Sequence, residues 1–339
     1  MAVTLSDVAR EAGVSLATAS RAINGSPTRT VRADLRDRVL AAAERLRYTP
    51  DANAQAVARG RTTSLGLVVH DIADPYFSSI ARGVTHAAGR AGLQVILAST
   101  EQDPSRELEI VELLRRQRAR AIVIAGGRHD DADATAALAA VLAEYRDSGG
   151  AAALVGQPVL GTDTVQIANA DGARALAREL HARGYRDVAV LAGPPTHLTA
   201  RERREAFVDE LARLGVRVPD ERVVAGAFDH DGGADAMRSL LAAGPVPELV
   251  FAVNDVMALG ALTAVRAAGL GVPDDLALAG FDDITTLRDV VPGLTTVRIP
   301  LEEVGVAATE LALEPAGGAP RVVPVETHVT IRESTPARG

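Results

Sequence analysis

The chain has 339 residues, no cysteine and a formal net charge of −8, and 47% of its residues are hydrophobic. A chain of this length can bury more than one core, and the absence of cysteine excludes disulfides and thiolate zinc sites. There is no signal-peptide pattern and no apolar run of about 18 residues, the length of a membrane-spanning helix. We therefore expect a soluble, cytoplasmic protein with no membrane partner.

Positive charge is concentrated at the N-terminus. Residues 1–61 contain ten arginines and six acidic residues, a net charge of +4, so the remaining residues carry −12. A basic segment on an acidic body fits a segment that meets phosphate groups and a body that does not.

Residues 4–25 predict two short helices joined by a tight turn. Thr4 and Asp7 approximate a capping box at the start of the first helix, and Gly13 is placed to end it. The second helix exposes small polar residues and one arginine, as the recognition helix of a helix-turn-helix does. Residues 31–48 predict a third helix that closes a small all-α head. A helical hairpin without a nucleic-acid role is the alternative.

From residue 65 onward, short apolar runs alternate with amphipathic segments. The strand candidates are residues 65–70, 93–98, 121–125, 151–155, 188–192, 249–253 and 276–281. The helix candidates are residues 77–91, 106–117, 172–183, 202–214 and 257–268. This alternation predicts an α/β body of parallel sheets flanked by helices, and its length favours two lobes. We expect an N-lobe at about 64–160 and 292–320, and a C-lobe at about 163–290 and 322–335. The crossings are expected near residues 161–164 and 291–293.

Polar side chains follow several of the predicted strands. Asp71, Arg128, Asn254 and Asp282 each come after a strand candidate. Ligands of open α/β sheets bind at the carboxyl ends of the strands, so these residues predict a cleft between the lobes that closes on a small molecule.

Catalytic and cofactor motifs are missing from the chain. It contains no Gly-x-Gly-x-x-Gly, Walker A, Gly-x-Ser-x-Gly or His-Glu-x-x-His sequence. The acidic clusters at residues 129–133 and 229–232 lack calcium-loop spacing, and we interpret them as solvated loops. We expect no catalytic residue, no metal site and no cofactor.

Several segments resemble the LacI–GalR family of transcription regulators, and the resemblance extends from about Thr4 to Thr335. Besides the head, it is carried by residues 48–54, 66–77, 199–203, 254–261, 280–283, 294–298 and 332–335. The resemblance implies a DNA-binding head at 1–49 and a hinge helix with linker at 50–63. It implies a periplasmic-binding-protein-like body at 64–339 that binds an effector and dimerises.

The resemblance also implies how DNA is bound. The DNA-binding positions are Thr4, Ser15, Leu16, Ala17, Thr18, Ser20, Arg21, Asn24, Asn53 and Val57. In the family, the recognition helix reads a palindromic operator in the major groove, and the paired hinge helices of a homodimer enter the minor groove with a leucine wedge. Val57 stands at the wedge position, so we expect a shallower wedge. Leu16 and Ala17 stand at specificity positions and offer bases only apolar contact.

The effector site follows from the strand ends and the resemblance together. The effector-binding candidates are Asp71, Tyr76, Phe77, Arg128, Arg201, Phe228, Asn254 and Asp282. The resemblance makes Arg201 and Asp282 the clamp on the effector. Local alternatives stay open: the aromatic residues as core, Arg201 as a surface charge, and Asn254 and Asp282 as caps. Gly156, Gln157, Ala168 and Ile299 depart from the family's sugar-binding pattern.

The favoured interpretation is a repressor whose operator affinity is controlled by a sugar or sugar derivative. A regulator that responds to a nucleoside or purine, and a solute-binding protein of a transporter, are the alternatives. An enzyme on a two-lobed scaffold is opposed by the absence of a catalytic constellation.

Overall fold

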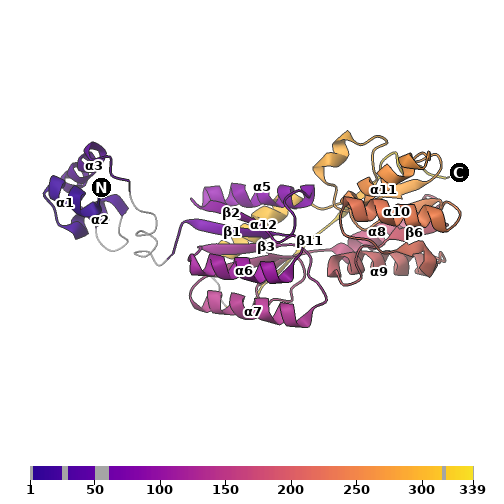
Figure 1. Ribbon diagram of the computed structural model, residues 1–339, viewed down its shortest axis with the longest axis horizontal. Helices are drawn as coiled ribbons and strands as arrows, with labels where there is room; N and C mark the ends of the chain where they lie inside the picture. The colour runs from indigo at the N-terminus through magenta and orange to yellow at the C-terminus, as the bar shows by residue number, and fades with distance from the viewer. Residues whose placement is uncertain (1–2, 25–29, 50–60, 315–317, 339) are drawn as a thin grey trace. The chain divides into compact units, whose positions relative to one another are not determined.

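The computed structural model describes residues 3–24, 30–49, 61–314 and 318–338 (Figure 1). The chain divides into two compact units, Met1–Thr63 and Ser64–Gly339. Most of the expected hinge, including Asn53 and Val57, lies outside the described residues.

The described part of the head contains three helices, α1 (Leu5–Ala12), α2 (Leu16–Asn24) and α3 (Ala33–Arg45). The expected capping box is confirmed: the Asp7 N–H donates to Thr4 Oγ1 (3.3 Å), and the Thr4 N–H donates to Asp7 Oδ2 (3.0 Å). Gly13 ends α1 with a φ of +63°, a value that favours glycine. The three helices bury a small core that includes Val8, Ala19 and Val39.

A six-stranded sheet with all neighbours parallel forms the first lobe, in the order β11-β5-β4-β3-β1-β2. Its strands are β1 (Ser64–Val69), β2 (Gln94–Ser99), β3 (Ala121–Ala125), β4 (Ala151–Val155), β5 (Asp163–Ile167) and β11 (Val322–Val325). Its helices are α5 (Pro75–Arg90), α6 (Pro104–Arg116), α7 (Ala132–Asp147) and α12 (Leu301–Leu313). Ile122 and Ile124 of β3 pack on one face with α6 and α7, while Val123 belongs to the core on the other face. The alternation buries both faces of β3, as in a parallel sheet between two helix layers.

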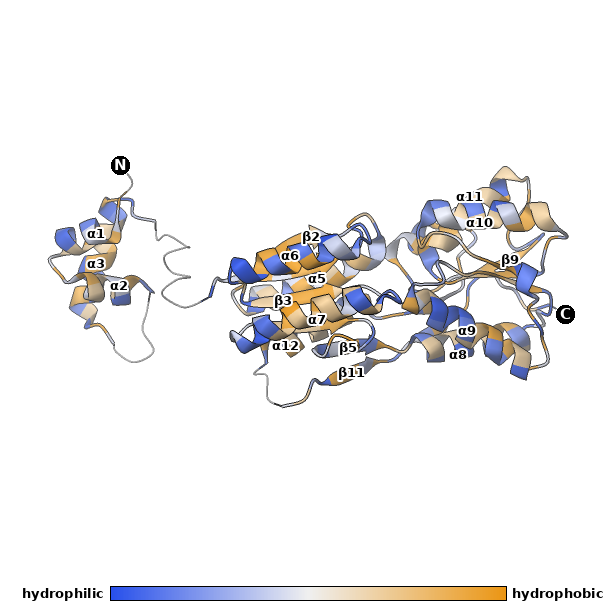
Figure 2. Ribbon diagram, turned by 60° about the horizontal axis from the view of Figure 1, so that its bottom comes forward, coloured by the Kyte–Doolittle hydropathy of each residue, from blue (hydrophilic) through white to orange (hydrophobic). Residues whose placement is uncertain are grey.

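The second lobe has a four-stranded parallel sheet in the order β7-β6-β8-β9. Its strands are β6 (Val188–Leu191), β7 (Val223–Val224), β8 (Leu249–Ala252) and β9 (Ala277–Ala279). Its helices are α8 (Asn169–Ala182), α9 (Leu198–Arg213), α10 (His230–Ala243) and α11 (Asp255–Ala267). Helices α10 and α11 lie on one side of this sheet, and α8 and α9 lie on the other (Figures 1 and 2). Every strand expected in the body is present, and Figure 2 shows hydrophobic residues concentrated in the strands and the inner helix faces.

The expected lobe boundaries are wrong at three strands, two of which belong to the first sheet. β5, expected to begin the C-lobe, is an interior strand of the first sheet between β4 and β11, and β11 is the edge strand beside it. The polar residues of β5 suggested a crossing segment, but its β-branched residues are buried and Asp163 pairs with Arg321 (2.6 Å). The chain therefore crosses between the lobes after β5, before α12 and after β11.

The crossing segments are held together by their backbones. The Ala168 N–H donates to Val325 O (3.0 Å), and the Ile299 N–H donates to Asp282 O (3.2 Å). Strand β10 (Thr296–Arg298), expected in the N-lobe, pairs antiparallel with β12 (His328–Thr330), and it also bridges to Asp282. β10 and β12 thus lie beside the second lobe.

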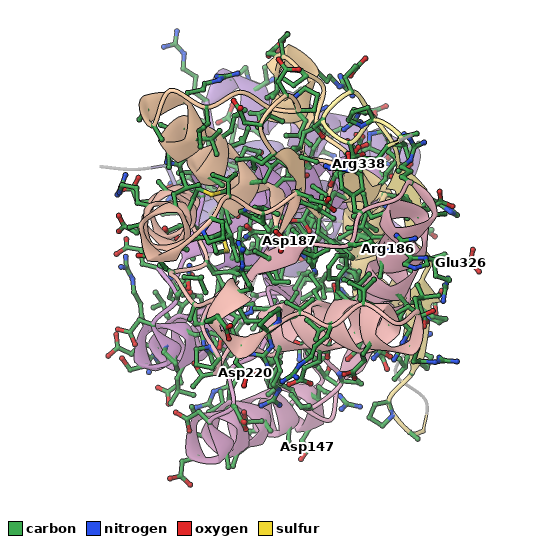
Figure 3. All side chains as sticks on the ribbon, turned by 90° about the vertical axis from the view of Figure 1, so that its right-hand side faces the viewer. Asp147, Arg186, Asp187, Asp220, Glu326 and Arg338 are labelled. Carbon is green, nitrogen blue, oxygen red and sulfur yellow. The ribbon has the colours of Figure 1, made fainter. Side chains whose placement is uncertain are left out.

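The C-terminal segment is attached to the second lobe by polar contacts. Arg338 pairs with Glu248 (3.0 Å), whose carboxylate also accepts the backbone N–H groups of Arg186 and Asp187; Arg186, Asp187 and Arg338 are labelled on this end of the body (Figure 3). The Tyr185 hydroxyl donates to Pro336 O (2.8 Å). Within the described residues, no helix combines the length and apolar character needed to cross a membrane.

Candidate functional site

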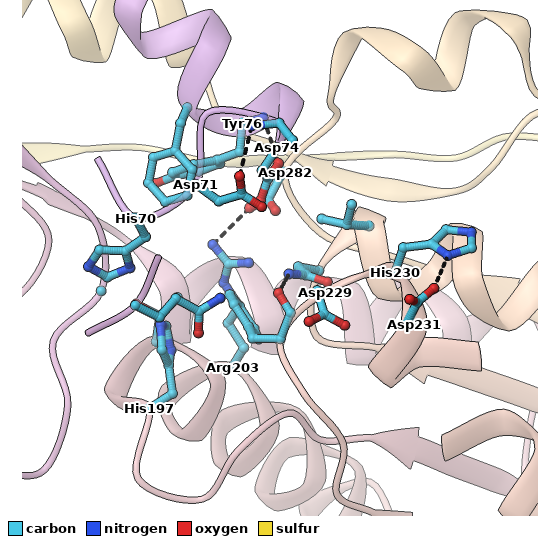
Figure 4. Close-up of a pocket in the computed structure, with 18 residues that line it drawn as sticks. His70, Asp71, Asp74, Tyr76, His197, Arg203, Asp229, His230, Asp231 and Asp282 are labelled. Atoms are coloured by element: carbon cyan, nitrogen blue, oxygen red, sulfur yellow. Dashed lines mark hydrogen bonds and ion pairs between the residues drawn. The ribbon is translucent and has the colours of Figure 1, made fainter. Parts of the chain in front are cut away.

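A cavity of about 330 Å³ lies between the two lobes of the body, bordered by residues from both (Figure 4). The first lobe contributes the segment from His70 to Phe77, which follows β1, together with Gln102 and Gly127. The second lobe contributes residues near the starts of α9, α10 and α11, and Asp282 follows β9. The size matches the lower range of small-molecule pockets.

Four helices begin at the cavity, and a side chain caps each of them. Asp74 accepts the Tyr76 N–H at the start of α5 (2.8 Å), and Asp229 accepts the Gly232 N–H at the start of α10 (2.7 Å). The remaining caps are His197 on α9, which accepts the Ala200 N–H (3.3 Å), and Asn254 on α11, which accepts the Met257 N–H (2.9 Å). The same side chains therefore cap the N-termini of the helices and border the cavity.

Arg203 lies at the floor of the cavity and is fully buried. Its Nε donates to Asn169 Oδ1 (2.9 Å), its Nη1 donates to Val253 O (2.9 Å), and its Nη2 lies 2.9 Å from Asp282 Oδ1. Its guanidinium carbon stands 3.9 Å from the centroid of the Phe281 ring. A planar fork held on three nitrogens and one face has a fixed orientation.

Asp282 is the buried counter-charge of Arg203. Burial raises the pKa of Asp282, and the Arg203 guanidinium opposes that rise. The residue has a φ of +120°, which is strained for a side chain other than glycine, and its N–H and C=O are tied to Val297 and Ile299. The strained backbone and its two hydrogen bonds hold the Asp282 carboxylate in one position between the crossing segments and the cavity.

Aromatic and imidazole rings form the other wall. Phe228 stacks on His197 with ring centroids 4.4 Å apart, and Tyr76 meets Phe77 edge-on. His70, His129 and His197 lie together, with centroids 5.1–6.4 Å apart, where the two lobes meet. Burial lowers the pKa of all three imidazoles, and the positive charge of Arg128 or of a neighbouring imidazole lowers it further. The cluster is neutral at pH 7.

The exposed face of α2 carries the residues expected to meet DNA. Ser15 caps the helix by accepting the Thr18 N–H (3.2 Å), and Leu16 is 50% exposed. Arg21 donates from Nε to Ala17 O (2.9 Å), and the Asn24 amide donates to Ser20 Oγ (3.3 Å). These contacts order polar side chains along the helix from Ser15 to Asn24, with the apolar side chain of Leu16 near its N-terminal end.

Comparison with known proteins decides the family. Residues 4–51 match the bacterial regulatory proteins of the lacI family, and residues 177–335 match a periplasmic binding protein-like domain. The chain is 35% identical to the regulator GalS of Salmonella typhimurium, over 93% of this chain and 91% of that protein. It is 31% identical to the repressor PurR of Haemophilus influenzae, over 92% of this chain and 90% of that protein. The chain belongs to the LacI family.

Among solved structures, the lac repressor dimer bound to operator and the anti-inducer ONPF matches with a TM-score of 0.85 and 26% identity. That match covers 99% of this chain and 100% of the repressor chain. The LacI-family chain is thus a DNA-binding transcription regulator with a ligand-binding body, and not an enzyme. Because its relatives match head and body together, the alternative of a transporter's solute-binding protein is wrong.

Most of the expected effector residues come together at the cavity of this LacI-family body. Asp71, Tyr76, Phe77, Phe228, Asn254 and Asp282 all border it. Asn254 is also the cap of α11, as its alternative interpretation expected, while its contact with an effector stays a prediction.

The placement of Arg201 in the clamp is wrong. Arg201 does not border the cavity; it pairs with Asp130 (2.7 Å) near the surface, and Arg203 is the arginine beside Asp282. The reason is helical periodicity, because Thr199 and Arg203 are four residues apart on one face of α9 and Arg201 lies off that face. The 3.6-residue period of the helix was the signal that could have found Arg203.

The placement of Arg128 in the cavity is also wrong. Arg128 follows β3, but its Nη2 lies 2.8 Å from both carboxylate oxygens of Glu107 on α6, and the pair is buried away from the cavity. Gln157 connects this region to the second lobe. It accepts the Arg128 N–H (2.9 Å) and donates to Thr199 Oγ1 (3.0 Å).

Sequence reasoning missed part of the cavity wall. Asp229, His230 and Asp231 were interpreted as a solvated loop, but Asp229 caps α10 and all three border the cavity. An aspartate directly before a segment with helical periodicity is an N-cap signal, and Asp229 could have revealed the start of α10. Asp131 of the other acidic cluster likewise caps α7. Asp74 and His197 are caps of the same kind.

Proposed function

We propose that this LacI-family regulator is a dimeric repressor whose operator affinity is controlled by a sugar or sugar derivative bound between the lobes. The observation that carries the proposal is the cavity itself, because its walls come from both lobes. A ligand there contacts both lobes at once, so its binding energy differs between lobe arrangements and can shift their equilibrium.

A sugar suits the wall chemistry. The stacked pair Phe228 and His197 offers a flat apolar surface, while Asp71, Asn254 and Thr199 offer hydrogen-bonding groups around it. The name of the relative GalS points to a sugar as the ligand of that protein, and this supports a sugar as the ligand class here. A purine is the second candidate, since the ring pair can stack a nucleobase and PurR is a relative.

We propose that the head contacts DNA chiefly through α2. The exposed positions of α2, Ser15 to Asn24, meet the bases and phosphates of the major groove, and Thr4 contacts a phosphate. Asn53 and Val57 contact the minor groove in a hinge that lies outside the described residues. A palindromic operator requires two heads, hence the dimer, and a protein that acts on operator DNA acts in the cytoplasm.

A thermal-shift screen of the full-length protein tests the effector class. Monosaccharides, disaccharides, sugar phosphates, nucleosides and purines are added at increasing concentration, and operator binding is then measured with and without each hit. A ligand at about 100 times its Kd adds roughly 2.7 kcal/mol to the free energy of unfolding. A sugar that stabilises the protein and releases the operator supports the proposal; a purine hit supports the second candidate; a blank panel contradicts both.

A further inference from the structure

Side chains of the protein occupy the helix N-termini around the cavity, where an anion could otherwise bind. A helix N-terminus normally attracts phosphate or carboxylate through its free N–H groups and its dipole. Here α5 and α10 are capped by the carboxylates of Asp74 and Asp229, and α9 and α11 by His197 and Asn254. An anionic ligand that approached α5 or α10 would meet a negative charge.

The charges that border the cavity are mostly negative. Its walls contain one arginine and five aspartates: Asp71, Asp74, Asp229, Asp231 and Asp282. The arginine, Arg203, is already paired with Asp282, and its other nitrogens donate to Asn169 and Val253. Among the described residues that border the cavity, no arginine is therefore left unpaired for a phosphate or carboxylate.

Asp71 and Asp74 lie on the same short segment between β1 and α5. Each uses one oxygen to accept a backbone N–H, from Ala73 and Tyr76 respectively (both 2.8 Å). Across the described residues, neither carboxylate forms an ion pair, whereas Asp282 has Arg203. Burial raises the pKa of Asp74 to about 6, and the charge of Asp71 adds to that rise. The charge of Arg203 partly opposes the rise in the pKa of Asp74, but its guanidinium is ion-paired with Asp282 rather than with this segment.

A buried acceptor lies on the same side of the cavity. Figure 4 shows Asp71, Asp74 and Asp282 gathered beyond the end of the Arg203 side chain. Asp282 is 3% exposed, and within the part of the chain that the structure describes its Oδ1 has the ion pair with Nη2 of Arg203 (2.9 Å) but no hydrogen bond of good geometry. A ligand that donates hydrogen bonds and carries positive charge would satisfy this whole group of oxygens.

We propose that the effector is a cationic amino sugar, a polyhydroxylated ring whose protonated amine is held by Asp71 and Asp74. The ring lies against Phe228 and His197, and the ligand carries no phosphate or carboxylate. This inference rests on the proposed function, because it names the ligand class of the same cavity.

Isothermal titration of the full-length protein at pH 7 compares matched ligands. Glucosamine, galactosamine and mannosamine are each tested beside the parent hexose, the N-acetyl derivative and the hexose 6-phosphate. We expect at least one amine to bind about ten-fold or more tightly than its parent and its N-acetyl form, since one charge pair near the surface can supply that difference. The phosphate should bind more weakly than the parent.

Asp74→Asn tests the counter-charge without removing the cap. Asparagine is as good an N-cap as aspartate, so α5 keeps its start while the charge is lost. The preference for the amine should fall to within about three-fold of the parent. Asp103→Asn is the matched control, because Asp103 caps α6 through the Ser105 N–H (2.8 Å) and lies outside the cavity wall. That variant should keep the full preference.

Each outcome decides the inference. A parent hexose or a phosphate that binds as tightly as the amine overturns the charge argument and leaves the proposed function standing. An amine preference that survives Asp74→Asn also overturns it. If no sugar of any arm binds, the amino-sugar inference fails together with the sugar class of the proposed function.

Discussion

Arg203 shows at the scale of one residue how the pocket and the fold depend on each other. Its guanidinium connects α8, β8 and the crossing segments through Asn169, Val253 and Asp282. A buried charge is stable only beside a partner charge, so Arg203 and Asp282 hold each other in place. Sequence reasoning placed this role two residues earlier, at Arg201.

Exchanging the two arginines for alanine separates these roles. Arg203→Ala leaves Asp282 buried without its counter-charge, and we expect a loss of about 3–5 kcal/mol in the free energy of unfolding together with loss of the ligand response. Arg201→Ala removes a pair between solvent-screened, partly exposed side chains and should change the free energy of unfolding far less. Urea unfolding of both variants measures the difference. A larger loss for Arg201→Ala would contradict the placement of the buried pair.

His197 predicts how acid affects stability. Its Nδ1 accepts the Ala200 N–H, so the imidazole caps α9 only while neutral, and burial lowers its pKa to about 3. Because the pKa is higher in the unfolded chain, at about 6.5, the unfolded state takes up the proton first as pH falls. The stability that the neutral ring provides is complete above pH 6.5 and is lost progressively between pH 6.5 and pH 3. At pH 5 the loss is on the order of 2 kcal/mol.

His197→Asn isolates this effect, since asparagine caps a helix without titrating in this range. We expect the variant to lose about 2 kcal/mol less than the wild type between pH 7.5 and pH 5, as followed by chemical unfolding. Removal of the exposed His86 by His86→Asn serves as the control and should leave the wild-type loss. Equal losses in wild type and His197→Asn would show that the buried ring has no such role.

At the scale of elements, the sequence predicted those strands and helices that have a clear hydrophobic pattern. Long apolar runs such as β3 and β8 were found because both faces of a parallel strand are buried. β5 was missed because its polar residues are paired within the sheet, as Asp163 is with Arg321, and a pattern cannot show a partner more than 150 residues away. Helix α10 was missed because its cap resembled an acidic loop.

The candidate site followed the same division. Residues next to a predicted strand, such as Asp71 and Asp282, were found because parallel strands end at one edge. Arg203 and His197 depend on which face of α9 meets the first lobe, and tertiary packing sets that face. Arg128 was misplaced because the sequence gives no sign that Glu107 neutralises it.

Helix α2 is the proposed recognition helix of the head. Arg21 lies on the surface proposed to meet DNA, so Arg21→Ala should weaken operator binding about ten-fold or more, with ligand binding by the body unchanged. Arg36→Ala removes the same charge from an exposed position on α3 and should have a smaller effect. Fluorescence anisotropy on a selected operator measures both. Loss of operator and ligand binding together in Arg21→Ala would argue against separate sites.

At the scale of the whole molecule, the two edges of the first sheet differ. One edge is β11, where Pro324 removes a backbone donor, as edge strands that avoid pairing often do. The other edge is β2, where Ile96 and Leu97 are 41% and 40% exposed and no proline interrupts the strand. If the protein is the proposed dimer, this exposed apolar edge is the contact that we expect between its protomers.

Ile96→Glu should therefore separate the proposed dimer, because a charge in an apolar contact is costly to bury. The expected result is a monomer in sedimentation velocity and a loss of roughly 100-fold or more in operator affinity, since two linked heads bind far more tightly than one. Val323→Glu places the same charge on β11, where Val323 is 38% exposed, and should leave the dimer intact. If Val323→Glu gave the monomer and Ile96→Glu did not, the contact would lie at the β11 edge. If both variants stayed dimeric with normal operator affinity, neither edge would join the protomers, and the dimer would have to form through the helical faces of the body.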